Sequence, residues 1–168
     1  MMDGLALIAE LPRLRRYARA LVGDRGLADD LVQDTLERAW AQAHRWQPGT
    51  NLRGWLLAIM HNLRVDALRR SRFDADPIDD EAVAAVPTRA TQDDRLELAG
   101  LAAALEQVPE TQRAVLLLVG LEEMTYAEIA ATLDVPIGTV MSRLARGRER
   151  LRAVLDGDAS PARLRVVR

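Results

Sequence analysis

The stretch that decides the fold is residues 125–151, TYAEIAATLDVPIGTVMSRLARGRERL. Thr125 followed three residues later by Glu128 is a capping box, which predicts the start of a short helix. The proline and glycine of residues 134–138 predict a tight corner, and a long helix follows it to about Leu155. Two helices joined by a short glycine-containing turn form a helix-turn-helix, so this stretch predicts a DNA-binding unit.

Two further helices are expected before this motif. Leucine, alanine and valine recur at helical spacing between Leu98 and Val108 and stop at Pro109, which can begin the next helix. Residues 114–119 are apolar on nearly every side of that helix and are therefore expected to be buried. Residues 93–156 thus predict a small helical domain, followed by a tail at 157–168.

Residues 1–73 predict a second helical domain. Apolar stripes at helical spacing run through 7–21, 28–43 and 52–67, and Pro12 marks either a break or a first-turn position. In the second stripe Trp40 is expected to face inward, and Thr50 or Asn51 is expected to cap the third helix. The fold class predicted is all-α, with two small helical domains joined by a flexible acidic linker at 74–92.

The net charge of the whole chain conceals a basic N-terminal domain. All 23 basic residues among the 168 are arginine, and the net charge is −2. Residues 1–73 carry 12 arginines against 8 acidic residues, whereas residues 74–97 carry 2 against 8. The acidic linker therefore masks a basic N-terminal domain, and the overall isoelectric point of about 5.7 does not argue against a nucleic-acid partner.

Several classes of function are excluded or disfavoured. The sequence has no cysteine, which excludes disulfides, thiolate catalysis and cysteine-ligated zinc. No apolar run approaches the ~20 residues of a membrane span. Asp29, Asp30 and Asp34 suggest a magnesium motif, but a solvated or protein-docking helix face fits their spacing better. Because no phosphate-binding loop or catalytic triad is present, we expect a non-enzymatic protein without a cofactor.

The last helix carries the residues expected to read duplex DNA. Arginine there can pair with guanine in the major groove, and serine or threonine can contact base edges or phosphate. The alternative interpretation is a solvated basic face near a helix C-terminus. The candidate residues are Thr139, Val140, Ser142, Arg143, Arg146 and Arg150.

A second candidate DNA-binding set lies in the N-terminal domain. Arginines interleaved with aromatic and amide side chains suit single-stranded DNA, whose phosphates they neutralise and whose bases they stack or hydrogen-bond. The alternative is that the aromatic residues belong to the core and the arginines to the surface. The candidate residues are Trp46, Asn51, Arg53, Asn62, Arg64, Arg69 and Arg70.

These motifs resemble a known family. The stretches DDLVQDTLERAW at 29–40, PGTNLRGWL at 48–56 and NLRVDALRR at 62–70 resemble the promoter-melting domain of bacterial RNA polymerase sigma factors. The stretches YAEIA at 126–130 and GTVMSRL at 138–144 are similar to the helix-turn-helix domain of the same family. With only these two domains, over about residues 10–155, the chain resembles the extracytoplasmic-function (ECF) group.

The resemblance implies a role for each segment. Residues 1–73 would dock on core polymerase and melt the −10 promoter element, residues 93–156 would read the −35 element, and the acidic linker would thread toward the RNA exit path. The implied partners are the β′ and β subunits of core polymerase, promoter DNA and an anti-sigma protein, in the cytoplasm and without membrane insertion. The implied docking residues on the β′ coiled coil are Asp29, Asp30, Gln33, Asp34, Glu37 and Arg38.

The sequence departs from the family pattern at two positions. Met141 stands where the family usually has a basic residue, which removes one phosphate contact, and Gly147 is expected to weaken the last helix by about 1 kcal/mol.

Two rival functions are possible. One rival is a sigma-like decoy that sequesters an anti-sigma protein, although such decoys need no DNA-reading arginines. The other is a conventional helix-turn-helix regulator, which would not need the docking face of the second helix and would typically dimerise.

Overall fold

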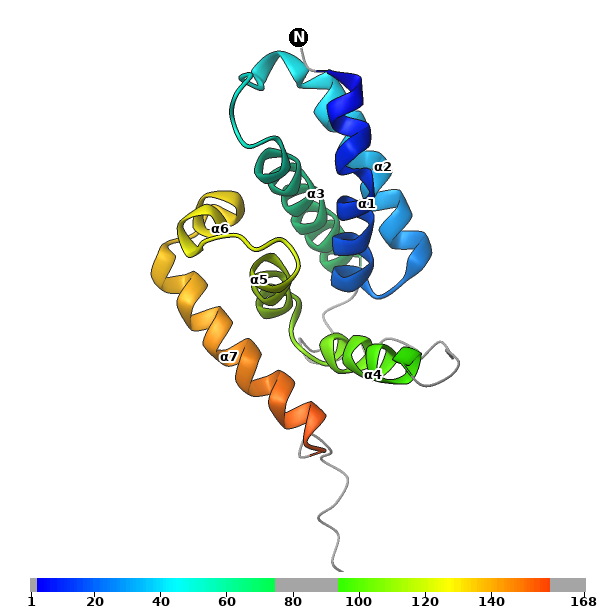
Figure 1. Cartoon of the computed structure of the whole chain (residues 1–168), viewed down its shortest axis with the longest axis vertical. Helices are drawn as coiled ribbons and strands as arrows, with labels where there is room; N and C mark the ends of the chain where they lie inside the picture. Colours follow the sequence, from blue (N-terminus) through cyan, green and yellow to red (C-terminus); the bar gives the residue numbers. More distant parts are fainter. Residues whose placement is uncertain (1–2, 75–93, 158–168) are drawn as a thin grey trace, which may run out of the picture.

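The computed structural model describes residues 3–74 and 94–157, and within them the chain is helical and contains no strand. The predicted all-α fold class is confirmed (Figure 1). The predicted linker lies outside the described residues except for Asp74, and so does nearly all of the predicted tail. The elements are α1 (Gly4–Val22), α2 (Arg25–Ala41), the 3-10 helix η1 (Ala43–Arg45), α3 (Leu52–Asp74), α4 (Asp94–Glu106), α5 (Glu110–Gly120), α6 (Tyr126–Leu133) and α7 (Ile137–Leu155).

The first half is a bundle in which α2 packs against both α1 and α3. Gly23 ends α1 with φ 78°, in the left-handed region that favours glycine, and Asp24 then caps α2. Both expectations for Pro12, a break or a first-turn position, are wrong, because α1 begins at Gly4 and runs through Pro12 without interruption. Pro12 lies on the exposed side of α1, where the carbonyl group of Ile8 can bond to water instead of to the missing N–H.

Trp40 departs from the sequence expectation. Its side chain is 64% exposed on α2, so the prediction that it faces inward is wrong. Thr35 and Ala39 are fully buried on the core face of this helix, and position 40 is turned by about 100° from position 39. The tertiary packing therefore leaves a large aromatic side chain at the surface.

The second half contains the helix-turn-helix. The capping box is present, since Thr125 accepts a hydrogen bond from the backbone N–H of Glu128, whose carboxylate accepts one from the N–H of Thr125 at 2.7 Å. Asp134 ends α6 in the left-handed conformation, and Pro136 precedes α7. The predicted helix, corner and long helix are thus confirmed.

Gly147 has a packing role that the sequence did not reveal. It is buried where α7 crosses α5, and a Cβ atom at this position would lie 3.1 Å from Cδ1 of Leu116. That distance is shorter than an ordinary van der Waals contact, so glycine allows the two helices to approach closely. Gly147 therefore lowers the helix propensity of α7 but allows α7 to pack closely against α5.

The two halves pack against each other. Helix α1 contacts α4 and α5, and α3 contacts α6, so that α5 and α6 lie beside the N-terminal bundle (Figure 1). The buried side chains of both halves form one continuous hydrophobic cluster. Arg113 of α5 is buried in this region and donates hydrogen bonds to the carbonyl oxygens of Leu21, Glu106 and Val108. The arrangement of the described residues is therefore compact.

Candidate nucleic-acid and polymerase interfaces

The six residues predicted to dock on polymerase lie together on the exposed side of α2. Within this set Gln33 donates a hydrogen bond to Glu37 at 3.0 Å, and Asp29 pairs with Arg19 of α1 at 3.5 Å. Asp30 and Asp34 are exposed one turn apart and point the same way along the helix. The face is acidic overall and suits a partner with basic side chains.

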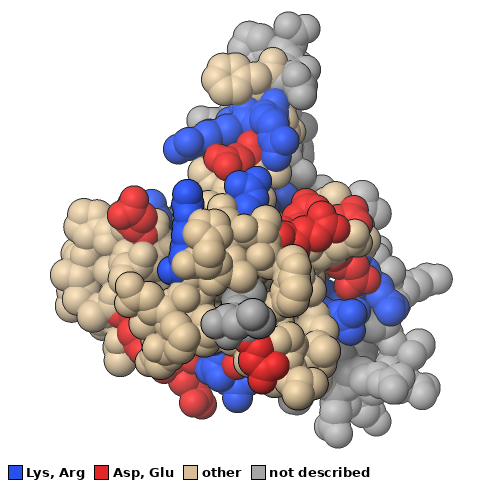
Figure 2. Space-filling model, turned by 90° about the horizontal axis from the view of Figure 1, so that it is seen from above, with Lys and Arg blue, Asp and Glu red and all other residues tan. Residues whose placement is uncertain are grey.

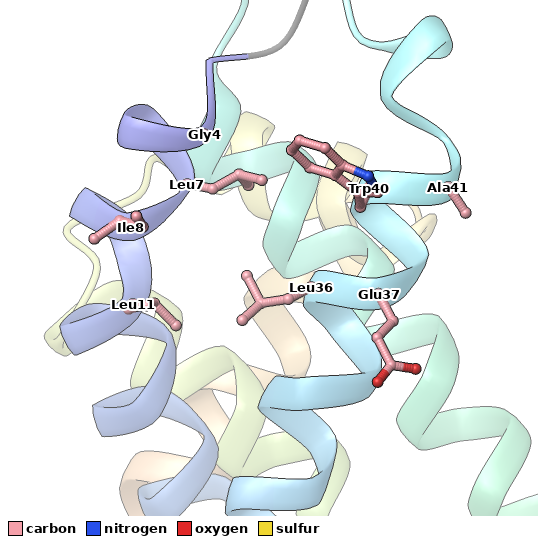
Figure 3. A pocket seen from close by; sticks show the side chains of 8 residues that line it. All are labelled: Gly4, Leu7, Ile8, Leu11, Leu36, Glu37, Trp40 and Ala41. Atoms are coloured by element: carbon pink, nitrogen blue, oxygen red, sulfur yellow. The ribbon is translucent and has the colours of Figure 1, made fainter.

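An apolar groove lies beside this acidic face, between the first turns of α1 and the last turns of α2 (Figure 3). Its volume is about 550 Å³, and Glu37 belongs both to its lining and to the acidic face. The side chain of Leu11 points across the groove toward that of Leu36, and at the upper end the side chain of Leu7 points toward the indole of Trp40 (Figure 3). Seen from above, this end of the molecule is dominated by uncharged surface, with charged groups at its margins (Figure 2).

The residues predicted to hold single-stranded DNA lie along α3 and in the loop before it. Asn62, Arg69 and Arg70 are exposed on α3, and Arg70 donates a hydrogen bond to the backbone oxygen of Asp66 at 3.4 Å. Asn51 accepts a hydrogen bond from the N–H of Gly54 at 3.0 Å and so caps α3, which confirms one of the two predicted caps.

Trp46 packs partly against the core, and its indole N–H has no hydrogen-bond partner within the described residues. A buried donor without a partner costs free energy in the folded chain. In this arrangement of the chain the buried donor is not accessible to a base edge.

The other two arginines of this set are paired with carboxylates. Arg64 of α3 donates from Nε and Nη2 to both carboxylate oxygens of Glu110 on α5, at 2.7 and 2.9 Å. Arg53 donates to Glu10 of α1 at 3.1 Å, and its Nε lies 3.8 Å from Glu122. The arginines were predictable from the sequence, but their partners Glu110 and Glu122 were not. No local sequence pattern indicates that carboxylates of a distant segment pair with these arginines.

Glu122 is an unusual member of this group. Its side chain is 1% exposed, and neither carboxylate oxygen has a hydrogen-bond partner within the described part of the chain. Burial raises the pKa of Glu122, while the charges of Arg53 and Arg16 oppose that rise. The loop between α5 and α6 thus places the buried carboxylate of Glu122 at the junction of the two halves.

Helix α7 exposes three of the six residues predicted to read DNA. Ser142, Arg146 and Arg150 are exposed, and Arg146 donates to the backbone oxygen of Ser142 at 3.3 Å. The inclusion of Val140 is wrong for this arrangement, because its side chain is completely buried and packs in the core. A position one residue away from an exposed helical side chain commonly faces the core.

Arg143 and Thr139 are half-buried. Burial lowers the pKa of His61 on α3, and the positive charge of Arg143 lowers it further.

Residues 3–74 and 94–157 contain no group of acidic or histidine side chains arranged to hold a metal ion. Over the same residues, no helix is both long and apolar enough to cross a membrane.

Comparison with known proteins identifies the family. Residues 7–61 match the family described as the Sigma2 domain of PhyR, and residues 98–151 match Sigma-70, region 4. The ECF RNA polymerase sigma factor EcfG of Rhodopseudomonas palustris is 37% identical over 154 residues, which cover 92% of this chain and 85% of that protein. The chain belongs to the ECF RNA polymerase sigma factors. It is therefore a transcription initiation factor and not an enzyme.

Other relatives of the sigma factor agree with this assignment. SigE of Mycolicibacterium smegmatis is 42% identical over 149 residues, covering 85% of the sigma factor and 57% of the relative. The crystallised sigma factor RpoE of Bartonella quintana, in complex with the anti-sigma factor NepR, superposes with a TM-score of 0.73 at 34% identity over 92% of this chain and 96% of that one. CnrH, in complex with the cytosolic domain of CnrY, gives a TM-score of 0.67 at 28% identity, with coverage of 93% and 88%.

Proposed function

We propose that this sigma factor binds core RNA polymerase, acts in the cytoplasm where that enzyme works, and directs it to promoters through both of its halves. The observation that carries the proposal is the combination, in one chain, of an exposed docking face on α2 and a helix-turn-helix with exposed arginines. A conventional helix-turn-helix regulator has no need of the first feature. Membership of the ECF family supports both.

We propose that polymerase contacts the acidic face of α2 together with the apolar groove beside it. Basic side chains of the β′ coiled coil would meet Asp30 and Asp34, and an apolar side chain would enter the groove next to Trp40. A large exposed aromatic residue at a pocket is the type of group that dominates the free energy of protein interfaces. The adjoining charges would orient the partner and speed its association.

We propose that α3 and the loop before it bind the unpaired strand of the −10 element, with residues 1–73 as the melting domain. The exposed Arg69 and Arg70 suit backbone phosphates, and Trp46 would contact a base once its buried indole N–H is uncovered. Residues 93–156 would read the −35 element through Arg143, Arg146 and Arg150 in the major groove.

We further propose control by an anti-sigma protein. This is supported by the crystallised relatives RpoE and CnrH, which were captured with NepR and CnrY. The rival function is that of a decoy for such a protein, and residues 7–61 match the Sigma2 domain of PhyR, a protein described as an anti-anti-sigma factor. The exposed arginines of α7 favour the sigma-factor function over the decoy function, because a decoy does not read DNA.

Run-off transcription with purified core polymerase and a library of genomic fragments tests the proposal. We expect discrete transcripts whose templates share one −35 and one −10 sequence, and none when the sigma factor is omitted. If folded sigma factor and active core polymerase give no transcript, the proposal fails. Capture of an anti-sigma protein by the same preparation would then identify the chain as a decoy.

A further inference from the structure

We infer that two exposed apolar side chains of α7, Ile137 and Met141, read the methyl groups of thymine in the −35 element and so determine specificity beside the arginines. The inference rests on the proposed −35 role of α7 and deepens it. In the major groove thymine is marked by its 5-methyl group, and apolar side chains are the groups that contact this methyl.

Helix α7 has a buried side and an exposed side. Val140 and Leu144 are buried in the core. Roughly opposite them lie three small residues, Gly138, Ser142 and Ala145, and all three are exposed. Because these side chains are small, the backbone of this part of α7 can approach the edges of base pairs closely.

Met141 and Arg146 flank the small residues. Successive positions of a helix are turned by about 100°, so these two side chains lie about 140° apart, with the small residues between them. Met141 is 52% exposed, and Ile137, one turn earlier on the same flank, is 49% exposed. One flank of the exposed side is therefore apolar and the other carries a guanidinium.

The surroundings of the apolar flank indicate a DNA partner. Helix α7 carries five arginines and one glutamate between Ile137 and Leu155, which suits a strongly anionic partner. The N-terminal turns of the second helix of a helix-turn-helix are the part that enters the major groove, and both apolar residues lie there. Helix α7 begins beside α6 at the edge of the molecule, so a groove can reach these turns (Figure 1).

Methionine at position 141 changes what this position can contribute. Its side chain has no charge for a phosphate and no donor for guanine, but it is flexible and fits an irregular apolar surface. Phosphate contacts carry no sequence information, whereas a contact with a thymine methyl depends on one base pair. Met141 therefore exchanges general affinity for sequence discrimination.

The two apolar residues are expected to read neighbouring base pairs. One helical turn separates Ile137 from Met141 by about 6 Å along the axis, and base pairs are stacked about 3.4 Å apart. We therefore expect up to two thymines of the −35 element to be read through their methyl groups.

The test removes single methyl groups from the DNA. Holoenzyme is assembled from the full-length sigma factor and core polymerase, and its affinity is measured for a fluorescein-labelled duplex that carries the −35 and −10 sequences found by run-off transcription. Each thymine of the −35 element, on either strand, is replaced in turn by deoxyuridine, which lacks only the 5-methyl group. The sigma variants are Ile137→Ala, Met141→Ala and Met141→Arg.

We expect deoxyuridine at one or two positions to weaken binding by the parent about fourfold, the effect of one hydrocarbon group left in water. Met141→Ala should abolish this penalty at one of these positions, and Ile137→Ala at the other if there are two. Met141→Arg should abolish the same penalty as Met141→Ala while it tightens binding to every duplex and steepens the salt dependence by about one ion. Leu155→Ala is the matched control, since it removes a 55% exposed apolar side chain at the far end of α7 and should keep every penalty of the parent.

Three results would overturn the inference: a −35 element without thymine on either strand, no penalty for deoxyuridine at any position, or penalties that persist in both alanine variants. A loss of holoenzyme formation by Met141→Ala, with the penalties unchanged, would assign this side chain to a contact with polymerase instead.

A duplex with a scrambled −35 element separates failure of the inference from failure of the proposed function. If the parent holoenzyme discriminates against the scrambled duplex but ignores deoxyuridine, the −35 role stands and only the inference fails. If the parent binds both duplexes equally, the −35 role itself fails.

Discussion

Arg113 donates a hydrogen bond from Nη1 to the backbone carbonyl oxygen of Leu21 at 2.6 Å, and so connects α5 to the end of α1. Its Nη2 donates to two further carbonyl oxygens, of Glu106 and Val108, at 2.8 Å each. One buried guanidinium thus bonds to three acceptors on two segments, the end of α1 and the turn between α4 and α5. A side chain with this role is expected to matter for stability and not for DNA binding directly.

Arg113→Met should lower the free energy of unfolding by about 3 kcal/mol, because the buried carbonyl groups lose a charged donor and methionine cannot replace it. Urea denaturation followed by circular dichroism measures the change. Arg148→Met, at an exposed position of α7, is the matched control and should remain within about 0.5 kcal/mol of the parent. Equal urea midpoints for the two variants would contradict the role assigned to Arg113.

Gly147→Ala should fail to stabilise the protein. Alanine is favoured over glycine in a helix by about 1 kcal/mol, but here the new Cβ atom would lie 3.1 Å from Cδ1 of Leu116 and would push the two helices apart. The matched control is Gly100→Ala on α4, where no atom lies within 4 Å of the new group. Thermal unfolding should show a gain for Gly100→Ala only, and the same gain at both positions would contradict the packing argument.

Reversal of charge on the docking face should abolish polymerase binding. In the double variant Asp30→Arg with Asp34→Arg, two exposed carboxylates of α2 become cations that repel the basic partner expected there. Co-purification with core polymerase measures the loss, and an unchanged melting temperature verifies the fold. A variant that still forms holoenzyme would exclude this face as the docking site.

Arg143→Ala should cost about 1–3 kcal/mol of discrimination between the sigma factor's own −35 sequence and a scrambled one. Arginine pairs with the major-groove edge of guanine, and alanine removes both donors. Competition binding of holoenzyme to the two duplexes gives the difference directly. An equal loss of affinity for both duplexes would instead identify Arg143 as a phosphate contact.

The free energy of unfolding should fall as the pH drops below about 6.5, in part because of His61. Burial and the charge of Arg143 lower its pKa in the folded state, so the unfolded chain takes up a proton before the folded chain does. The contribution of His61 is therefore complete above the unfolded pKa and is lost as the pH falls through the folded one. Urea denaturation at pH 7.5 and 5.5 measures this loss.

His61→Gln should reduce that pH dependence, since glutamine does not titrate. The matched control is His44→Gln, which removes the exposed histidine of η1 and should keep the parent's dependence. If the two variants lose equal stability between these pH values, His61 is not the group responsible.

The sequence by itself determined the helices and the helix-turn-helix. Apolar periodicity, the capping box at Thr125 and Glu128, and the cap at Asn51 are local signals that act within a few residues. These signals specify the same local structure regardless of how the rest of the chain folds. The exposure of the acidic face of α2 was predictable for the same reason, because an exposed helical stripe follows from residue spacing alone.

Only the tertiary structure decided which side chains face the junction between the halves. Trp40 is exposed and Arg64 pairs with Glu110, although no local pattern distinguishes these residues from their neighbours. Gly147 likewise acquired its role from the leucine on a different helix that packs against it. Contacts between distant segments depend on how whole helices pack, and side-chain periodicity specifies the buried face of each helix but not the partner that covers it.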